Sequence, residues 1–147
     1  YYLAQEGIGA TTLVHVGGDA VIGLPHPEVI KLFQQDPETK AIVMFGEIGG
    51  SQEERVADLI ESGEVTKPVV AYIGGKAAKS GTRFSYYGAF DAQEIFEEIP
   101  AGDYVIEGGR GTYEGKVDRL RSVGATVVEA FGDLPAATKE VLAGLGL

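Results

Sequence analysis

The sequence predicts an α/β fold in which helices cover both faces of a parallel sheet. Apolar, β-rich runs alternate with helical patterns along the 147 residues, the order typical of β-α-β units. The run "PVVAYI" at 68–73 is apolar almost throughout, as in a strand buried on both faces. Because the length suits one core and no repeat or linker divides the chain, we expect residues 1–147 to form a single domain.

The first predicted elements are two strands separated by a helix. "TTLVHV" at 11–16 is rich in β-branched residues and predicts a strand. "HPEVIKLFQQ" at 26–35 predicts a helix, because its apolar residues fall on one side. "AIVMF" at 41–45 predicts the next strand, which runs into the glycine-rich turn "GEIGG".

The helix predicted at 51–63 carries its own boundary signals. Ser51 is a favourable N-cap, and Glu54 three residues later completes a capping box. Gly63 supplies the stop at the other end. The strand at 68–73 follows this helix.

Three further helices alternate with two strands in the rest of the chain. In order, these elements are a short acidic helix at 91–99, a strand at 103–109, a helix at 112–124, a strand at 125–130 and a helix at 133–144. Thr112 and Asp133 are the expected N-caps of the last two helices.

Composition excludes several classes of function. The net charge of −10 argues against broad binding to nucleic acid or anionic membranes, although backbone N–H groups can still hold one anion. The chain has no cysteine and two histidines, so we expect no metal site. No apolar run approaches the length of a membrane helix and no signal peptide is visible, so we expect a cytoplasmic protein.

Three glycine-rich turns are expected near the carboxyl ends of the strands, where α/β sheets bind ligands. They are "GGD" at 17–19, "GEIGG" at 46–50 and "GGRGT" at 108–112. One reading is an anion site at this edge, and the other is ordinary tight turns and helix starts.

Four stretches of the chain closely resemble the second domain of the succinyl-CoA synthetase α subunit. They are "VGGDAVIG", "LFQQDPETKAIVMFGEIGGSQEE", "VTKPVVAYIGGKAAKSGTRFSYYGAF" and "GGRGTYEGKVDRLRSVGATV". ATP-citrate lyase and the NDP-forming acyl-CoA synthetases carry the same domain. The resemblance implies a flavodoxin-like three-layer sandwich, CoA and ATP or GTP as cofactors, and ligation of a carboxylic acid to CoA.

One position of the family's histidine loop is altered. The family sequence is roughly R-M-G-H-A-G-A-I, and its histidine carries a phosphoryl group. In this chain "RFSYYGAF" aligns with that loop, so that Tyr86 stands where the family has the phosphorylated histidine. A tyrosine with a pKa near about 10 is a poor nucleophile without an activating base, so we do not expect Tyr86 to carry the phosphoryl group.

The resemblance also assigns residues of the two later turns. Glu47 matches the family glutamate that contacts the phosphohistidine, and here it would accept a hydrogen bond from Tyr86. The alternative for Glu47 is a carboxylate favoured by a helix dipole. The turn "GGRGT" is expected to bind an anion through five residues: Gly108, Gly109, Arg110, Gly111 and Thr112.

Two departures from the family bear on function. An acidic insertion follows the altered loop, at about 91–106. In addition, the family's first strand of this domain and its CoA-binding Rossmann domain have no counterpart in residues 1–147. For a flavodoxin-like order 2-1-3-4-5 that strand is an interior one, so we expect the chain to be a fragment or another chain to supply the strand.

Three functional alternatives follow. The chain is a ligase-type domain that works with an ATP-grasp β-type subunit and a Rossmann domain, or it is a non-catalytic relative that keeps the fold and the interface. In the third, His15 replaces the missing histidine in an altered transfer, although a structural histidine is the more ordinary role. A homo-oligomer is also compatible with the sequence.

Overall fold

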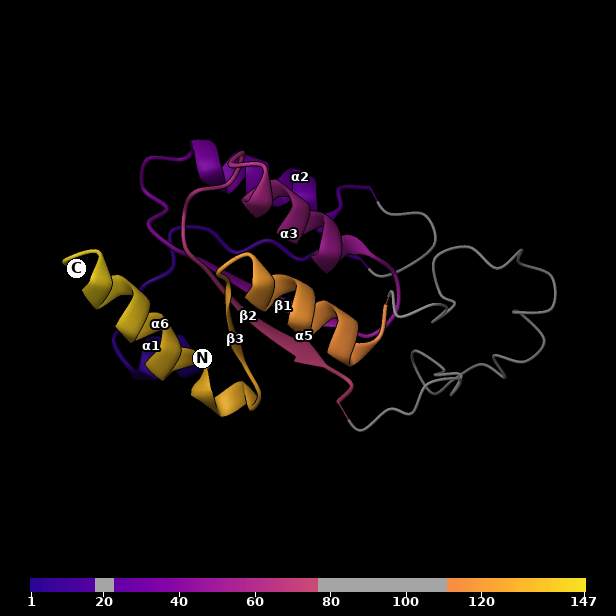
Figure 1. Ribbon diagram of the computed structural model, residues 1–147. Coiled ribbons are helices and arrows are strands. Elements are labelled where there is room, and N and C mark those ends of the chain that lie inside the picture. The colour runs from indigo at the N-terminus through magenta and orange to yellow at the C-terminus, as the bar shows by residue number, and fades with distance from the viewer. Residues whose placement is uncertain (18–22, 77–110) are drawn as a thin grey trace, which may run out of the picture.

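The computed structural model describes residues 1–17, 23–76 and 111–147, and shows a parallel sheet between two layers of helices (Figure 1). The strands are β1 (Ile42–Glu47), β2 (Val69–Gly74) and β3 (Thr126–Val128), paired in the order β1-β2-β3. The register of β1 and β2 runs from Ile42 opposite Val69 to Glu47 opposite Gly74. The predicted α/β class with a parallel sheet is confirmed.

Helices lie on both faces of this sheet. They are α1 (Tyr2–Gln5), α2 (His26–Gln35), α3 (Gln52–Glu61), α5 (Tyr113–Ser122) and α6 (Leu134–Gly144), with a 3-10 turn η1 (Phe131–Asp133) before α6. Helices α3 and α5 cover one face and pack against each other, and α2 packs on α3. Helix α6 covers the other face, next to the short α1 (Figure 1).

The core lies mainly between the sheet and the α3–α5 layer. Its buried side chains come from alternate positions of β1, from almost all of β2, and from the inner sides of the helices; they include Ile42, Met44, Val56, Ala71, Ile73, Val117 and Leu120. Strand β2 is buried on both faces, as its apolar run predicted. Strand β1 is buried only at every second residue, so that Val43 and Phe45 stay exposed on the α6 side.

The strand predicted at 11–16 is wrong. This segment forms no strand, and Leu13 and Val14 are 91% and 42% exposed. A strand needs a hydrogen-bonded neighbour, and within the described residues no strand pairs with the outer edge of β1. The β-propensity of these residues therefore has no partner that could convert it into a sheet.

Two of the predicted helix boundary signals are confirmed, and the predicted capping box is wrong. Thr112 caps α5 as predicted, accepting a hydrogen bond from the N–H of Gly115 at 2.9 Å. Gly63 ends α3 in the left-handed region, at a φ of 78°. The predicted capping box of Ser51 and Glu54 is wrong. The Ser51 side chain makes no cap hydrogen bond, and Glu54 accepts the N–H of Gly111 instead.

Asp133 is not a side-chain cap of α6 either. Its backbone lies in the right-handed helical region at the end of η1, so the chain passes from a 3-10 turn directly into α6. A capping side chain needs an extended backbone at its own position, and that geometry is missing here. The helix predicted at 91–99 and the strand predicted at 103–109 lie outside the described residues.

Candidate functional site

Two of the glycine-rich turns meet at the carboxyl end of the sheet. The loop 46–50 leaves β1 and leads into α3, and the turn before α5 ends at Gly111 and Thr112. The N–H of Gly49 donates a hydrogen bond to the carbonyl of Gly111 at 2.8 Å. The backbone of one turn therefore holds the other in place. This agrees with the prediction from the sequence that these turns lie at the same edge of the sheet.

Glycine is required at two positions of this edge by close approach. A Cβ on Gly46 would lie 2.4 Å from the carboxylate oxygen Oε1 of Glu53. A Cβ on Gly111 would lie 3.1 Å from the carbonyl oxygen of Gly50, and Gly111 also has a φ of 75°. These glycines let the two turns and the start of α3 come together.

Glu47 is the last residue of β1 and lies at this edge. Its side chain is half-buried, and its N–H donates to Oε1 of Glu53 at 3.2 Å. Burial raises the pKa of the Glu47 carboxyl above its ordinary value of 4.5, and the negative charge of Glu53 raises it further, whereas Lys116 opposes the rise. The surroundings of Glu47 therefore favour the protonated form of its carboxyl group.

Glu53, which accepts the N–H of Glu47, belongs to a buried ion pair. Lys116 of α5 is completely buried, and its ammonium donates to Oε2 of Glu53 and, at 2.6 Å, to the carbonyl of Gly49. Glu53 is 4% exposed, so both charges are removed from water. Burial of two ions is costly unless their geometry and hydrogen bonds are good, which makes this pair a feature that needs an explanation.

Glu54 connects the same cluster to the turn before α5. Its Oε1 accepts the N–H of Gly111 at 2.9 Å, and its Oε2 lies 4.0 Å from the ammonium of Lys116. Within the described part of the chain, Oε2 accepts no hydrogen bond although it is buried. The N–H of Gly111, one of the groups expected to bind an anion, is therefore already used by a carboxylate.

The predicted site residues are only partly placed by the structure. Glu47, Gly111 and Thr112 lie together at the edge. Tyr86, Gly108, Gly109 and Arg110 lie outside the described residues, so the expected contact of Glu47 with Tyr86 stays a prediction. His15 is exposed in the segment 11–16.

Two residues of the cluster were missed from the sequence. Lys116 and Glu53 were not among the site residues predicted from the sequence. However, Lys116 is three residues after Tyr113 and four before Leu120, so it falls on the apolar stripe of α5. Glu53 likewise falls in line with Val56 and Ala57 of α3. A charge inside an apolar stripe was the signal.

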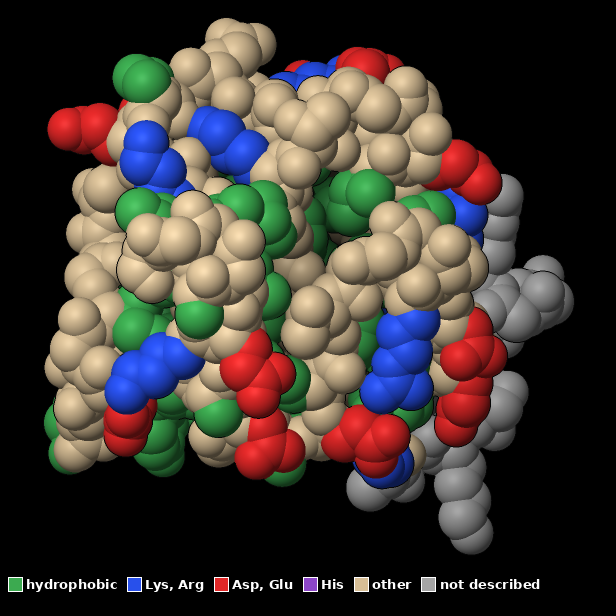
Figure 2. Space-filling model, turned by 60° about the vertical axis from the view of Figure 1, so that its left-hand side comes forward, with side chains coloured by type: hydrophobic (Ala, Val, Ile, Leu, Met, Phe, Trp, Pro, Cys, Tyr) green, Lys and Arg blue, Asp and Glu red, His purple; other side chains and the backbone are tan. Residues whose placement is uncertain are grey.

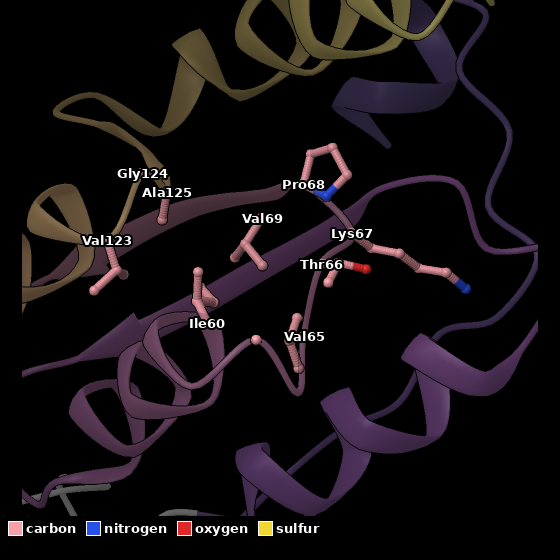
Figure 3. A pocket seen from close by; sticks show the side chains of 10 residues that line it. Ile60, Val65, Thr66, Lys67, Pro68, Val69, Val123, Gly124 and Ala125 are labelled. Carbon is pink, nitrogen blue, oxygen red and sulfur yellow. The ribbon is translucent and has the colours of Figure 1, made fainter.

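Two hollows among the described residues lie at the opposite end of the sheet. A cavity of about 310 Å³ is bordered by residues where β2 and β3 begin, together with the end of α3 (Figure 3). Its side chains are mainly aliphatic, such as Ile60, Val69 and Val123. Lys67 extends away from the cavity in Figure 3 and donates to the carbonyls of Phe33 and Asp36. This cavity therefore offers no free charged group to a ligand.

The surface shows no extended basic area on the face seen in Figure 2. Lys and Arg side chains there are scattered, and several lie next to Asp or Glu. Arg119, for example, is paired with Asp58 and Glu61. Within the described ranges there is no cluster of metal-ligating side chains, and no helix long and apolar enough to cross a membrane.

Comparison with known proteins identifies the family. The family model described as CoA-ligase matches residues 1–95, which is more than half of the chain. The chain belongs to this CoA-ligase family. The prediction made from the four similar stretches is thereby confirmed.

The relatives of this CoA-ligase chain include α subunits of acyl-CoA ligases. It is 45% identical over 129 residues to the succinate–CoA ligase [ADP-forming] subunit alpha of Aquifex aeolicus, covering 88% of the chain and 37% of that protein. It is 40% identical over 140 residues to subunit alpha 1 of Archaeoglobus fulgidus, covering 95% and 42%. A third relative is the ADP-forming sulfoacetate-CoA ligase subunit SqwL of an Acholeplasma species, 37% identical over 145 residues, covering 99% and 43%.

A solved structure agrees with the fold. The CoA-ligase chain matches the ATP citrate lyase of Methanosaeta concilii, solved as a D541A mutant with (3S)-citryl-CoA, with a TM-score of 0.69 and 25% identity. This match covers 88% of the chain and 19% of the lyase. The chain thus spans about two fifths of its curated relatives and one fifth of the lyase.

Proposed function

We propose that this chain is the α-type domain of a nucleotide-dependent carboxylate–CoA ligase that does not pass its phosphoryl group through a histidine. The observation that carries the proposal is the alignment of almost the whole chain with the α subunit of a succinate–CoA ligase and with a subunit of a sulfoacetate-CoA ligase. The position of Glu47 in the loop that is bonded to Gly111 supports it, because that glutamate matches the family residue beside the phosphohistidine.

The chemical reason for the second half of the proposal is Tyr86. A neutral imidazole is available near pH 7, whereas a phenol with a pKa of about 10 is protonated there. A phosphoramidate also passes its phosphoryl group on readily, and an aryl phosphate ester does so less readily. Glu47 would accept a hydrogen bond from the Tyr86 hydroxyl, which orients the ring without turning it into a good carrier.

We propose CoA and ATP or GTP as the cofactors of the complete assembly. The relatives are named as CoA ligases, two of them ADP-forming subunits alpha of succinate–CoA ligase, and the lyase structure holds citryl-CoA. The corresponding partners are an ATP-grasp β-type subunit and a Rossmann domain. Within this chain, the residues proposed for an anionic group are Gly108, Gly109, Arg110 and Thr112, because the N–H of Gly111 is bonded to Glu54.

A second candidate is a non-catalytic relative that keeps the fold and the partner interface. The replacement of histidine by Tyr86 favours it, and so does the acidic insertion at about 91–106. In this case the edge at Glu47 would contact a partner without phosphoryl transfer.

Labelling with γ-³²P-ATP and γ-³²P-GTP separates these functions. The protein, with its natural partner, is incubated with each nucleotide and tested for acid-labile phosphate and for acyl-CoA formation from succinate. We expect no acid-labile label, and formation of acyl-CoA supports the ligase over the non-catalytic relative. Acid-labile label mapped to a histidine would overturn the claim that no phosphohistidine forms.

The variant Tyr86→His sharpens this experiment, and Tyr86→Phe is its matched control. If the edge retains the family geometry, Tyr86→His gains acid-labile label and Tyr86→Phe does not. If Tyr86→His stays unlabelled with an active β-type subunit present, the edge has diverged further than this one residue, and the non-catalytic candidate gains.

A further inference from the structure

The buried ion pair of Lys116 and Glu53 is the feature that the proposed function leaves unexplained. Lys116 is completely buried, although the same helix carries Arg119 and Arg121 at its surface. Replacing a buried ion pair by apolar residues is often neutral or stabilising, so stability alone is a weak reason for the pair. Its bonds to surrounding groups indicate a different reason.

Each charged atom of the pair has a bond that leads to the edge. The ammonium of Lys116 holds the carbonyl of Gly49 at 2.6 Å, and Oε1 of Glu53 holds the N–H of Glu47 at 3.2 Å. The pair therefore contacts the loop 46–50 at both sides of Ile48. Two backbone groups of opposite polarity are fixed by two charges that are themselves fixed to each other.

The same cluster reaches the turn before α5. Gly49, whose carbonyl is bound by Lys116, donates its own N–H to the carbonyl of Gly111. Glu54, near the ammonium of Lys116, accepts the N–H of Gly111. Both backbone groups of Gly111 are thus held by residues that Lys116 contacts.

We propose that Lys116 and Glu53 are positioning residues, which hold Glu47 and the loop 46–50 at a fixed place relative to the turn at Gly111. They act through the backbone and do not touch the reacting groups themselves. This inference rests on the proposed function, because the position of Glu47 matters to chemistry only if the edge is the working site.

Among the residues that the structure describes, three charged groups lie near Glu47 or the loop that carries it. Glu53 and Glu54 are on α3, and Lys116 is on α5. The charge of Glu53 raises the pKa of Glu47 and that of Lys116 lowers it. A change of Glu53 should therefore be visible at the Glu47 carboxyl itself, which a merely structural ion pair elsewhere between the helices would not affect.

The test follows the Glu47 carboxyl carbon by NMR as a function of pH in the ¹³C- and ¹⁵N-labelled protein. We expect Glu53→Gln to lower the pKa of Glu47, because it removes the facing negative charge while an oxygen stays available to the Glu47 N–H. The matched control is Arg119→Met. Arg119 joins the same two helices through Asp58 and Glu61, at 2.7 and 2.6 Å, but contacts neither Glu47 nor the loop.

A second variant covers the case in which Glu53→Gln alone does not fold. The double variant Glu53→Gln/Lys116→Met removes both charges of the ion pair together, so neither partner stays buried without the other, and the variant is expected to fold. It loses the bond from Lys116 to Gly49, and the amide signals of Gly49 and Gly111 should shift more than in Arg119→Met. The inference is overturned if the folded variants change the Glu47 titration and these amides no more than the control does. The NMR result does not depend on ³²P labelling, so the inference about Lys116 and Glu53 can fail separately from the proposed function.

Discussion

At the residue scale, Gly46 is the position where the edge tolerates least change. Gly46→Ala should destabilise the fold by about 1–3 kcal/mol, because its Cβ would lie 2.4 Å from Oε1 of a Glu53 side chain that is itself held in place. The control is Gly74→Ala in the neighbouring strand. Its nearest neighbour would be the carbonyl oxygen of Gly46, at an ordinary 3.6 Å. Urea unfolding of both variants measures the difference, and equal losses would contradict the steric reason.

Glu47 gives a prediction on pH at the same scale. Its pKa is raised in the folded chain, so the folded state binds the proton more tightly than the unfolded state does. The contribution of Glu47 to stability is therefore present below its ordinary value of 4.5 and is lost as the pH rises through the raised pKa. Glu47→Gln should remove this loss and stabilise the chain slightly at pH 7.

Thermal unfolding of Glu47→Gln and the unchanged chain between pH 4 and 8 checks this sign. The difference in unfolding temperature should be small at pH 4 and should grow in favour of Glu47→Gln toward pH 8. A variant that is less stable at pH 8 would show that the ionised Glu47 makes a favourable contact.

At the scale of elements, the two helices that start at the edge begin in different ways. Thr112→Ala should cost about 1 kcal/mol, because the Thr112 hydroxyl accepts the N–H of Gly115. Ser51→Ala should cost much less, because the Ser51 side chain makes no cap bond although it also precedes a helix. Chemical denaturation of the pair tests this, and a larger loss for Ser51→Ala would contradict it.

The elements also show what the sequence could and could not predict. The helix expected at 26–35 has those bounds in the structure, because the apolar period that predicted it is local. The Thr112 cap was local too. By contrast, the partner of Glu54 is Gly111, which lies far along the chain, and a capping-box pattern cannot show such a competitor. The burial of Lys116 depends in the same way on a helix that only folding brings near.

At the scale of the whole molecule, the main feature is the unpaired outer edge of β1. Its outer edge has no strand beside it among the described residues, and Val43 and Phe45 are exposed on the α6 side. Phe45 lies in a group of aromatic rings with Tyr72 and Phe131. An unpaired edge beside an apolar face is a site for pairing with another strand, and the strand that the sequence analysis expects from outside residues 1–147 would pair there.

The open edge predicts self-association of residues 1–147 when no such strand is present. Val43→Lys should reduce it, because a lysine on an edge strand opposes pairing between sheets. Leu32→Lys is the control, since Leu32 is even more exposed, at 55%, but lies on α2. Sedimentation velocity over a range of concentrations measures the effect. Equal reduction by both variants would show that general surface apolarity, and not the edge, drives association.

The loop 46–50 has a consequence for how this protein can change over evolution. Gly75 lies so close to Ile48 that a Cβ there would be 2.8 Å from its side chain, and Gly111 accepts a hydrogen bond from Gly49. The same short loop therefore contacts the chain just before and just after residues 77–110. Lengthening a segment whose two ends are already held together costs little further entropy. Insertions or substitutions between 77 and 110 can therefore accumulate without moving Glu47. Related proteins can differ in the reactive residues of this segment while the sheet and the loop 46–50 stay the same.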